Sequence, residues 1–191
     1  KGVSSKENIQ DAQNFAKKLG VKTILQEINS FSEPFSRLPW KQTNLSKTNT
    51  LPRLRAIILY NYANSNDCLV VGTGNKTELM LGYFTKYGDG AADFFPIGTL
   101  WKTKVYELAK ERKLPIEFLE KTPTAELWVG QTDEKELGLT YKEMDEMLVK
   151  LVDKGKKVSE LVKMGYSKDK LIHLNKLVSG SRHKRLTPPI L

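Results

Sequence analysis

The sequence from Leu69 to Pro96, LVVGTGNKTELMLGYFTKYGDGAADFFP, decides the fold class. An apolar run at its start, Cys68 to Val71, has the length and β-branched content that predict a buried strand. Gly72 and Gly74 then break the chain, and a helix is predicted over Asn75 to Phe84. A strand that turns through glycines into a helix presents free N–H groups and the positive end of the helix dipole at the carboxyl end of a sheet. Anionic ligands bind at such positions in open α/β folds, so we predict a nucleotide site here.

The composition is that of a globular protein of one domain. The chain has 191 residues, of which 39% are hydrophobic and 28% are charged. Apolar runs fall short of the roughly 20 residues that a membrane helix needs, and the polar, basic start of the sequence does not resemble a signal peptide. The single Cys68 cannot form an internal disulfide or a cysteine-based zinc site, which fits a reducing cytosol.

The net charge of +9 is concentrated near the C-terminus. The residues from Lys150 onward include eleven Lys/Arg and three Asp/Glu. Such an end suits nucleic acid, a membrane surface or the phosphates of a small molecule. The sequence has neither Arg/Gly-rich repeats nor an aromatic-basic platform, so the first two ligands are disfavoured. A solvated basic surface is the simplest alternative.

Helix and strand patterns alternate in the first part of the chain. A serine at position 4 or 5 caps a predicted helix that runs to Leu19, and Val21 to Ile28 predicts a strand. A helix followed by a strand is half of a parallel βαβ unit. Asn29 to Pro52 contains three prolines and many Ser, Thr and Asn residues, so we predict a loop with at most a turn of helix. A further helix is predicted from Arg53 to about Asn64.

The chain after about Leu100 is predicted to be entirely helical. Helices are expected over Leu100 to Arg112, over Val158 to Met164 and over Lys168 to Val178. Thr140 and Glu143 have the spacing of a capping box at the start of another helix. The pattern as a whole is therefore α/β, with a helical C-terminal part.

Four blocks resemble one known family. They are GTGNKTELMLGYFTKYGDGAADFFPIG, LWKTKVYELAK, TPTAELWVGQTDEKELG and RHKRLTPP, in that order. Together they resemble ammonia-dependent NAD synthetase, a pyrophosphatase-loop ATP enzyme. The resemblance implies a parallel sheet flanked by helices, a single synthetase domain over residues 1–191, and a cytoplasmic homodimer that binds neither nucleic acid nor membrane. It also implies adenylation of deamido-NAD by ATP and Mg²⁺, followed by displacement of AMP by ammonia to give NAD.

The chain departs from the family in one respect. Members carry an N-terminal strand and a Ser-Gly-Gly-x-Asp-Ser loop that holds the ATP phosphates, and these 191 residues do not match it. Either the sequence is a piece that lacks this loop, or the protein cannot bind ATP as the family does. The absence of an initial methionine favours the first interpretation.

Glu78 has two interpretations. Asn75 to Glu78 fits a capping box, with Asn75 as N-cap and Glu78 at N3. The resemblance instead implies a Mg²⁺ ligand at Glu78, five residues after Thr73, which would contact ATP. One carboxylate is enough for a Mg²⁺ ion that also binds phosphate oxygens and water. We favour the metal.

Lys102 and Thr124 are ordinary residues by pattern, a surface lysine and a turn residue. The resemblance assigns both to ATP, with Lys102 and Glu78 as the catalytic residues. A lysine beside the phosphates stabilises the charge that grows on departing pyrophosphate. That role also accounts for a cation in the first turn of a helix, where it opposes the dipole.

The resemblance assigns five positions to deamido-NAD: Arg53, Lys86, Asp93, His183 and Lys184. Cationic groups suit the pyrophosphate and the nicotinate carboxylate of this substrate, and Asp93 would orient a ribose hydroxyl or the pyridine end. The alternative for the last two is a solvated basic tail.

Large aromatic residues near these blocks are expected to pack in the core or to line the pocket, and not to take part in the reaction. They are Tyr83, Phe84, Trp101 and Trp128.

Two rival functions stay open. One is a related adenylating amidotransferase of the GMP or asparagine synthetase type. The other is a non-catalytic dinucleotide-binding or basic interaction protein.

Overall fold

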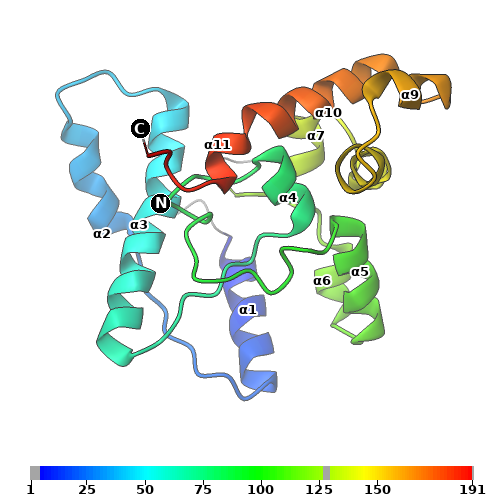
Figure 1. The fold of residues 1–191 in the computed structure, drawn as a ribbon. Helices are drawn as coiled ribbons and strands as arrows, with labels where there is room; N and C mark the ends of the chain where they lie inside the picture. Colours follow the sequence, from blue (N-terminus) through cyan, green and yellow to red (C-terminus); the bar gives the residue numbers. More distant parts are fainter. Residues whose placement is uncertain (1–4, 127–129, 191) are drawn as a thin grey trace.

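The computed structural model describes residues 5–126 and 130–190, and its regular structure there is helical (Figure 1). The elements in order are α1 (Lys6–Lys18), α2 (Asn29–Ser32), the 3-10 turn η1 (Glu33–Arg37), α3 (Asn44–Asn66), α4 (Lys76–Leu81), α5 (Lys102–Glu111), α6 (Ile116–Glu120), α7 (Asp133–Leu137), α8 (Tyr141–Leu148), the π-turn η2 (Val149–Asp153), α9 (Val158–Lys163), α10 (Lys168–Gly180) and α11 (Arg182–Arg185). None of the described helices is long and apolar enough to cross a bilayer.

The described residues do not form the predicted parallel sheet. Val21 to Ile28 has no regular secondary structure, and the strand-like pairing in the described residues is one parallel bridge between Val71 and Phe94. Within the described residues, the prediction of a buried strand at Cys68 to Val71 is wrong, because Cys68, Leu69 and Val71 are exposed there. This segment pairs along one edge only, so Val70 alone turns into the protein.

The predicted loop at residues 29–52 is also wrong. α2 and η1 occupy its first part, and α3 begins at Asn44 with the Thr43 hydroxyl accepting from the Ser46 N–H. Thr48 and Thr50, whose type suggested a loop, donate their hydroxyl hydrogens to carbonyls one turn earlier in α3. Pro52 lies buried inside this helix.

α4 is shorter than predicted but begins as predicted. Asn75 and Glu78 exchange the two hydrogen bonds of a capping box. The helix ends at Gly82 rather than near Phe84, because Gly82 has a φ of 70° and closes the helix in the left-handed conformation. A side chain there would also collide with Ser181, which packs against the end of α4.

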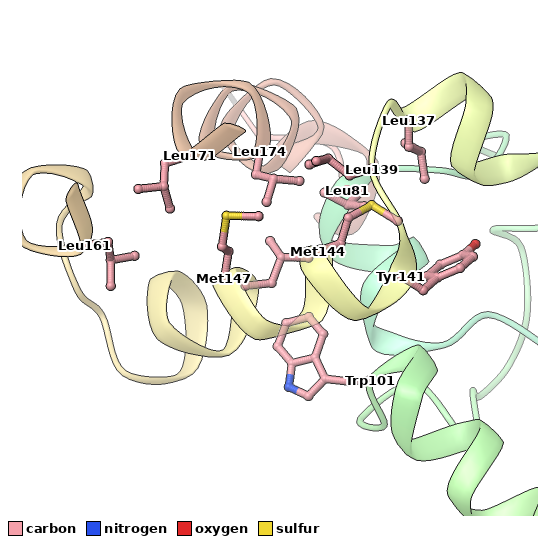
Figure 2. Close-up of a cluster of buried hydrophobic side chains, with 11 residues drawn as sticks. Leu81, Trp101, Leu137, Leu139, Tyr141, Met144, Met147, Leu161, Leu171 and Leu174 are labelled. Carbon is pink, nitrogen blue, oxygen red and sulfur yellow. The ribbon is translucent and has the colours of Figure 1, made fainter. Parts of the chain in front are cut away.

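The helical C-terminal part is confirmed, and it contains the main core. Figure 2 shows side chains from α4, α9 and α10 packed against those of α8, with Trp101, the N-cap residue of α5, below α8. The cluster consists of Leu81, Trp101, Leu137, Leu139, Tyr141, Met144, Met147, Leu148, Leu161, Leu171 and Leu174. The capping box predicted from Thr140 and Glu143 begins α8. This core contains Leu81 at the end of α4 and Trp101 at the N-cap of α5, so it joins the two helices that carry Glu78 and Lys102.

Candidate active site

Two helix starts bring Glu78 and Lys102 together. Glu78 is at N3 of α4 and Lys102 is the first residue of α5. The Lys102 ammonium lies 3.2 Å from Glu78 Oε1, and the two side chains are 19% and 18% exposed. Glu78 Oε2 meanwhile accepts from the Asn75 N–H at 3.1 Å. Glu78 is therefore both a helix cap and the partner of a largely buried cation.

Aromatic rings form the rest of the environment of Lys102. Its ammonium lies 5.2 Å from the ring centre of Tyr141 and 6.0 Å from that of Tyr106. The Tyr141 hydroxyl donates to Asp133 Oδ2 at 2.8 Å, and burial together with the Asp133 charge raises the pKa of Tyr141. Tyr141 thus stays neutral beside the lysine.

A separate set of cations lines a cavity of about 750 Å³. The cavity lies between α3, the segment after α4, and α11, and the basic residues that line it include Arg53, Lys86, His183 and Lys184. Asp89 and Glu136 are the acidic residues that line it among the described residues. The volume is that of a typical small-molecule site.

Backbone carbonyls hold these cations. Lys184 Nζ donates to the Gly82 carbonyl at 2.6 Å and to the Phe84 carbonyl at 2.8 Å. Lys86 Nζ donates to the His183 carbonyl at 2.7 Å, and Arg53 Nε to the Lys86 carbonyl at 3.2 Å. Desolvation by burial lowers the pKa of Lys184. Within the described residues, none of these three cations has a carboxylate within ion-pair distance.

The basic C-terminal segment is docked on the protein. Arg185 donates to the Leu79 and Met80 carbonyls at the end of α4 and to the Val178 carbonyl in α10. These carbonyls are near the ends of their helices, where a cation is favourable. Figure 1 shows α11 lying against α4 as a result. The alternative of a freely solvated tail therefore does not hold for Lys184 and Arg185, whereas the side chain of His183 is exposed and only its backbone carbonyl is held, by Lys86.

Not all of the predicted site residues meet. Thr73 lines the cavity together with Arg53, Lys86, His183 and Lys184, whereas Glu78 and Lys102 do not. Among the described residues, Asp93 and Thr124 do not line it. Asp93 Oδ2 accepts from the Val70 N–H at 2.6 Å, and the Thr124 hydroxyl accepts from the Glu126 N–H at 3.1 Å, although the neighbouring Ala125 reaches the cavity.

The aromatic residues predicted to be core or pocket wall can be placed where the structure describes them. Trp101 belongs to the core, and Tyr83 and Phe84 are cavity wall, as expected. Trp128 lies outside the described residues.

Three contributing residues were not predicted from the sequence. Asp89 is in the quoted KYGDG turn, where its carboxylate accepts from the Thr85 N–H, and the turn itself was a signal. Thr77 accepts from the Lys102 N–H and Asp145 from the Thr103 N–H. The sequence did not indicate either role, because a threonine in a helix and an aspartate on an amphipathic helix are common.

Glu78 is the predicted metal ligand, and its surroundings can be compared with what a metal ion needs. Residues 5–126 and 130–190 contain no cluster of three or more His, Cys, Asp or Glu that could bind one. Each Glu78 oxygen accepts one hydrogen bond and keeps a further lone pair. This donor set fits a Mg²⁺ ion whose other ligands are phosphate oxygens and water.

Comparison with known proteins agrees with the motifs. The sequence profile of the NAD synthase family matches residues 1–188. The NH3-dependent NAD+ synthetase of Archaeoglobus fulgidus is 44% identical over 189 residues, which are 99% of this chain and 73% of the relative.

Two solved structures are similar over nearly the whole chain. NMN synthetase from Francisella tularensis has a TM-score of 0.82 at 38% identity, covering 97% of this chain and 74% of that one. NH3-dependent NAD synthetase from Campylobacter jejuni has a TM-score of 0.80 at 31% identity, covering 98% and 73%. The resemblance in the motifs is thereby confirmed, and this chain belongs to the NAD synthase family.

Proposed function

We propose that this protein is an ammonia-dependent NAD synthetase that converts deamido-NAD, ATP and ammonia to NAD, AMP and pyrophosphate. The observations that carry this function are a cavity whose cations rest on carbonyls, and the Glu78–Lys102 pair at the starts of α4 and α5, which is not among the residues that line the cavity. The cavity suits a dianionic dinucleotide, and the pair suits a reacting phosphate. Membership of the family and 44% identity to a curated NAD+ synthetase support the same reaction.

The chemistry needs positioning and charge rather than a protein nucleophile. A carboxylate oxygen of deamido-NAD attacks the α-phosphorus of ATP, and the bond to the departing pyrophosphate breaks. Lys102 would stabilise the charge that develops on the pyrophosphate. Ammonia then attacks the acyl carbon and loses a proton to solvent as AMP leaves. Thr73 and Thr124 would offer hydroxyls to the nucleotide.

Mg²⁺ would be held by Glu78, the phosphates of ATP and water. When bound it would neutralise phosphate charge. Lys102 donates to the same carboxylate in this structure, and its flexible stem would let the ammonium reach the phosphates while the backbone of α5 stays in place.

The dinucleotide would bind in the cavity. Arg53, Lys86, His183 and Lys184 would contact its pyrophosphate and nicotinate carboxylate through charge-assisted hydrogen bonds. Asp93 is exposed and does not line the cavity. It would therefore contact the ribose or the pyridine end only if that part of the ligand extends beyond the cavity.

The decisive experiment is product analysis with the complete protein. Deamido-NAD, ATP, Mg²⁺ and ammonium chloride should yield NAD and AMP in equal amounts. Labelled pyrophosphate should exchange into ATP when deamido-NAD is present and ammonia is absent, which reports the adenylated intermediate. Turnover with xanthosine monophosphate or aspartate instead would favour a related amidotransferase, and binding of deamido-NAD without turnover would favour the non-catalytic alternative.

A second substrate is raised by one comparison. The similar Francisella tularensis structure is named NMN synthetase, at 38% identity. Amidation of nicotinate mononucleotide would use the same chemistry on a ligand that lacks the AMP half. The ratio of kcat/KM for deamido-NAD to that for nicotinate mononucleotide decides between them, and we expect it to favour the dinucleotide because the cavity has about 750 Å³ to fill.

We also propose that the family's parallel sheet involves Val21 to Ile28 and Cys68 to Val71. The parallel bridge at Val71 and the TM-scores of 0.82 and 0.80 support it. Slow amide exchange at Leu69 and Val71 in the complete protein is the expected result. Rapid exchange at both amides would contradict a sheet here.

The homodimer and the cytoplasmic location stay predictions of the resemblance. Exposed apolar side chains on α3, Ile57 and Tyr62, support an association surface. Sedimentation velocity should give the dimer mass, and Ile57→Glu should shift it toward the monomer if α3 forms the interface. Cell fractionation tests the location.

A further inference from the structure

The first turn of α5 takes its caps from other helices. Trp101 occupies the N-cap position and provides no side-chain cap. The Lys102 N–H instead donates to the Thr77 hydroxyl oxygen in α4 at 2.9 Å, and the Thr103 N–H donates to Asp145 Oδ2 in α8 at 2.8 Å. Two of the free donors that begin every helix are thus satisfied by residues distant in sequence.

Thr77 and Asp145 are joined to each other. The Thr77 hydroxyl donates to Asp145 Oδ1 at 2.6 Å. Thr77 is completely buried and Asp145 is only 3% exposed. The Asp145 carboxylate therefore receives one hydrogen bond from the Thr77 hydroxyl in α4 and another from the Thr103 N–H in α5, and the Thr77 oxygen itself accepts from the Lys102 N–H in α5. Since α4 carries Glu78 and α5 carries Lys102, this junction sets the separation of the two side chains.

We propose that Thr77 and Asp145 are positioning residues that hold Lys102 against Glu78 for the reaction. The proposal rests on the proposed function, in which Lys102 contacts ATP. A buried carboxylate is an expensive way to join helices, because it must be stripped of water. What it supplies here is two acceptor atoms at a fixed spacing, which one hydroxyl or amide oxygen cannot replace.

The expected effect follows from the substitution geometry. Thr77→Val keeps the shape but leaves the Lys102 N–H and Asp145 Oδ1 without partners, so the start of α5 is free to shift. Asp145→Asn can accept from only one of its two donors, because its amide nitrogen cannot accept. A displacement of about 1 Å at a catalytic group costs on the order of a hundredfold in rate.

The test compares Thr77→Val and Asp145→Asn with two other variants in the complete protein. Thr77→Ser keeps the hydroxyl and should restore most of the kcat lost in Thr77→Val. Leu161→Val removes a methylene from the core at a residue that Figure 2 shows far from Trp101 and Tyr141, and should lower the melting temperature without changing kcat more than about threefold. For each variant we would measure kcat, KM for deamido-NAD, KM for ATP and the melting temperature.

We expect Thr77→Val and Asp145→Asn to lower kcat by roughly ten- to a hundredfold and to change the KM for deamido-NAD by less than about threefold. A kcat near wild type in both overturns the proposal. So does a loss that Leu161→Val reproduces at the same melting temperature, or a variant that is unfolded at room temperature, because either assigns the pair to stability alone.

Lys102→Ala separates this proposal from the proposed function. If Lys102→Ala keeps its activity, the role of Lys102 itself is wrong. If Lys102→Ala is inactive and Thr77→Val is not, only the positioning role fails.

Discussion

The starts of α4 and α8 are built alike, and only one of them lies at the site. Each has a glutamate at N3 that completes a capping box, Glu78 with Asn75 and Glu143 with Thr140. Each glutamate also pairs with a lysine from another helix, at 3.2 Å for Lys102 and 2.6 Å for Lys170. The local sequence pattern is therefore the same at both places.

The surroundings differ. Glu78 and Lys102 are less than a fifth exposed, whereas Glu143 and Lys170 are 41% and 45% exposed. The α4 box follows the Gly72–Gly74 segment, part of which lines the cavity, and its lysine packs against the Tyr141 ring. The α8 box faces solvent. Burial and neighbours, rather than the capping motif, distinguish a ligand from a cap.

The largest expected effect comes from making one substitution at both boxes. Glutamine at N3 can still accept from the N-cap N–H, so helix stability should change little in Glu78→Gln. The lost charge should abolish Mg²⁺-dependent adenylation, by at least about a hundredfold in kcat. Pyrophosphate exchange and thermal melting measure the two quantities.

Glu143→Gln is the matched control, with the same cap position and the same loss of a lysine partner. We expect its kcat to stay within about threefold of wild type. Equal activity losses in the two variants would mean that the comparison has no functional content and that Glu78 is a cap.

A second expected effect concerns Lys184, which has no carboxylate partner among the described residues, in contrast to Lys102 and Lys170. Lys184 rests on carbonyls, so its charge stays available to an anion. Loss of a charge-assisted hydrogen bond costs roughly 1.5–3 kcal/mol, which is about ten- to more than a hundredfold in affinity. Lys184→Ala should raise the KM for deamido-NAD by that factor and leave the KM for ATP nearly unchanged.

Lys176→Ala removes the same charge from an exposed position of α10 and serves as the control. Its KM values should match wild type. Salt-sensitive nucleic-acid binding that weakens only in Lys184→Ala, with unchanged KM values, would instead assign the segment to nucleic acid.

The sequence predicts the helix starts better than the tertiary pairing. Both capping boxes, and the helices α5, α9 and α10, follow from local spacing, whereas the short helices α6, α7 and α11 were not predicted. The burial of Cys68 to Val71 depends on neighbours along both strand edges, and the described residues supply Phe94 on one edge. An apolar run alone cannot report that.

The site divides along the same line. Glu78 and Lys102 were assigned from a resemblance, and their 3.2 Å contact depends on Thr77 and Asp145, which lie 68 positions apart. Long-range hydrogen bonds such as the one between Thr77 and Asp145 leave no periodic trace in the sequence. The error at α3 has a local cause, because the Thr48 and Thr50 hydroxyls bond to carbonyls within the helix that their residue types argued against.

The smallest expected effect concerns the stability of the protein at acidic pH. Hydrogen bonds from Lys170 and then from Thr140 lower the pKa of Glu143 from 4.5 to about 2. A carboxyl whose pKa is lower in the folded protein contributes stability above its unfolded pKa, and this contribution is lost as pH falls through the folded pKa. The loss should therefore occur between about pH 4.5 and pH 2.

Glu143→Gln should melt slightly below wild type at neutral pH, with the difference shrinking toward pH 2 as wild-type Glu143 becomes protonated. The exposure of both partners keeps the effect small, since water and salt screen the pair. Melting temperatures of the two proteins across this range provide the measurement, at low and at high salt. A difference in melting temperature that stays constant with pH would show that the charge of Glu143 does not contribute to stability and that Glu143 acts through its cap geometry alone.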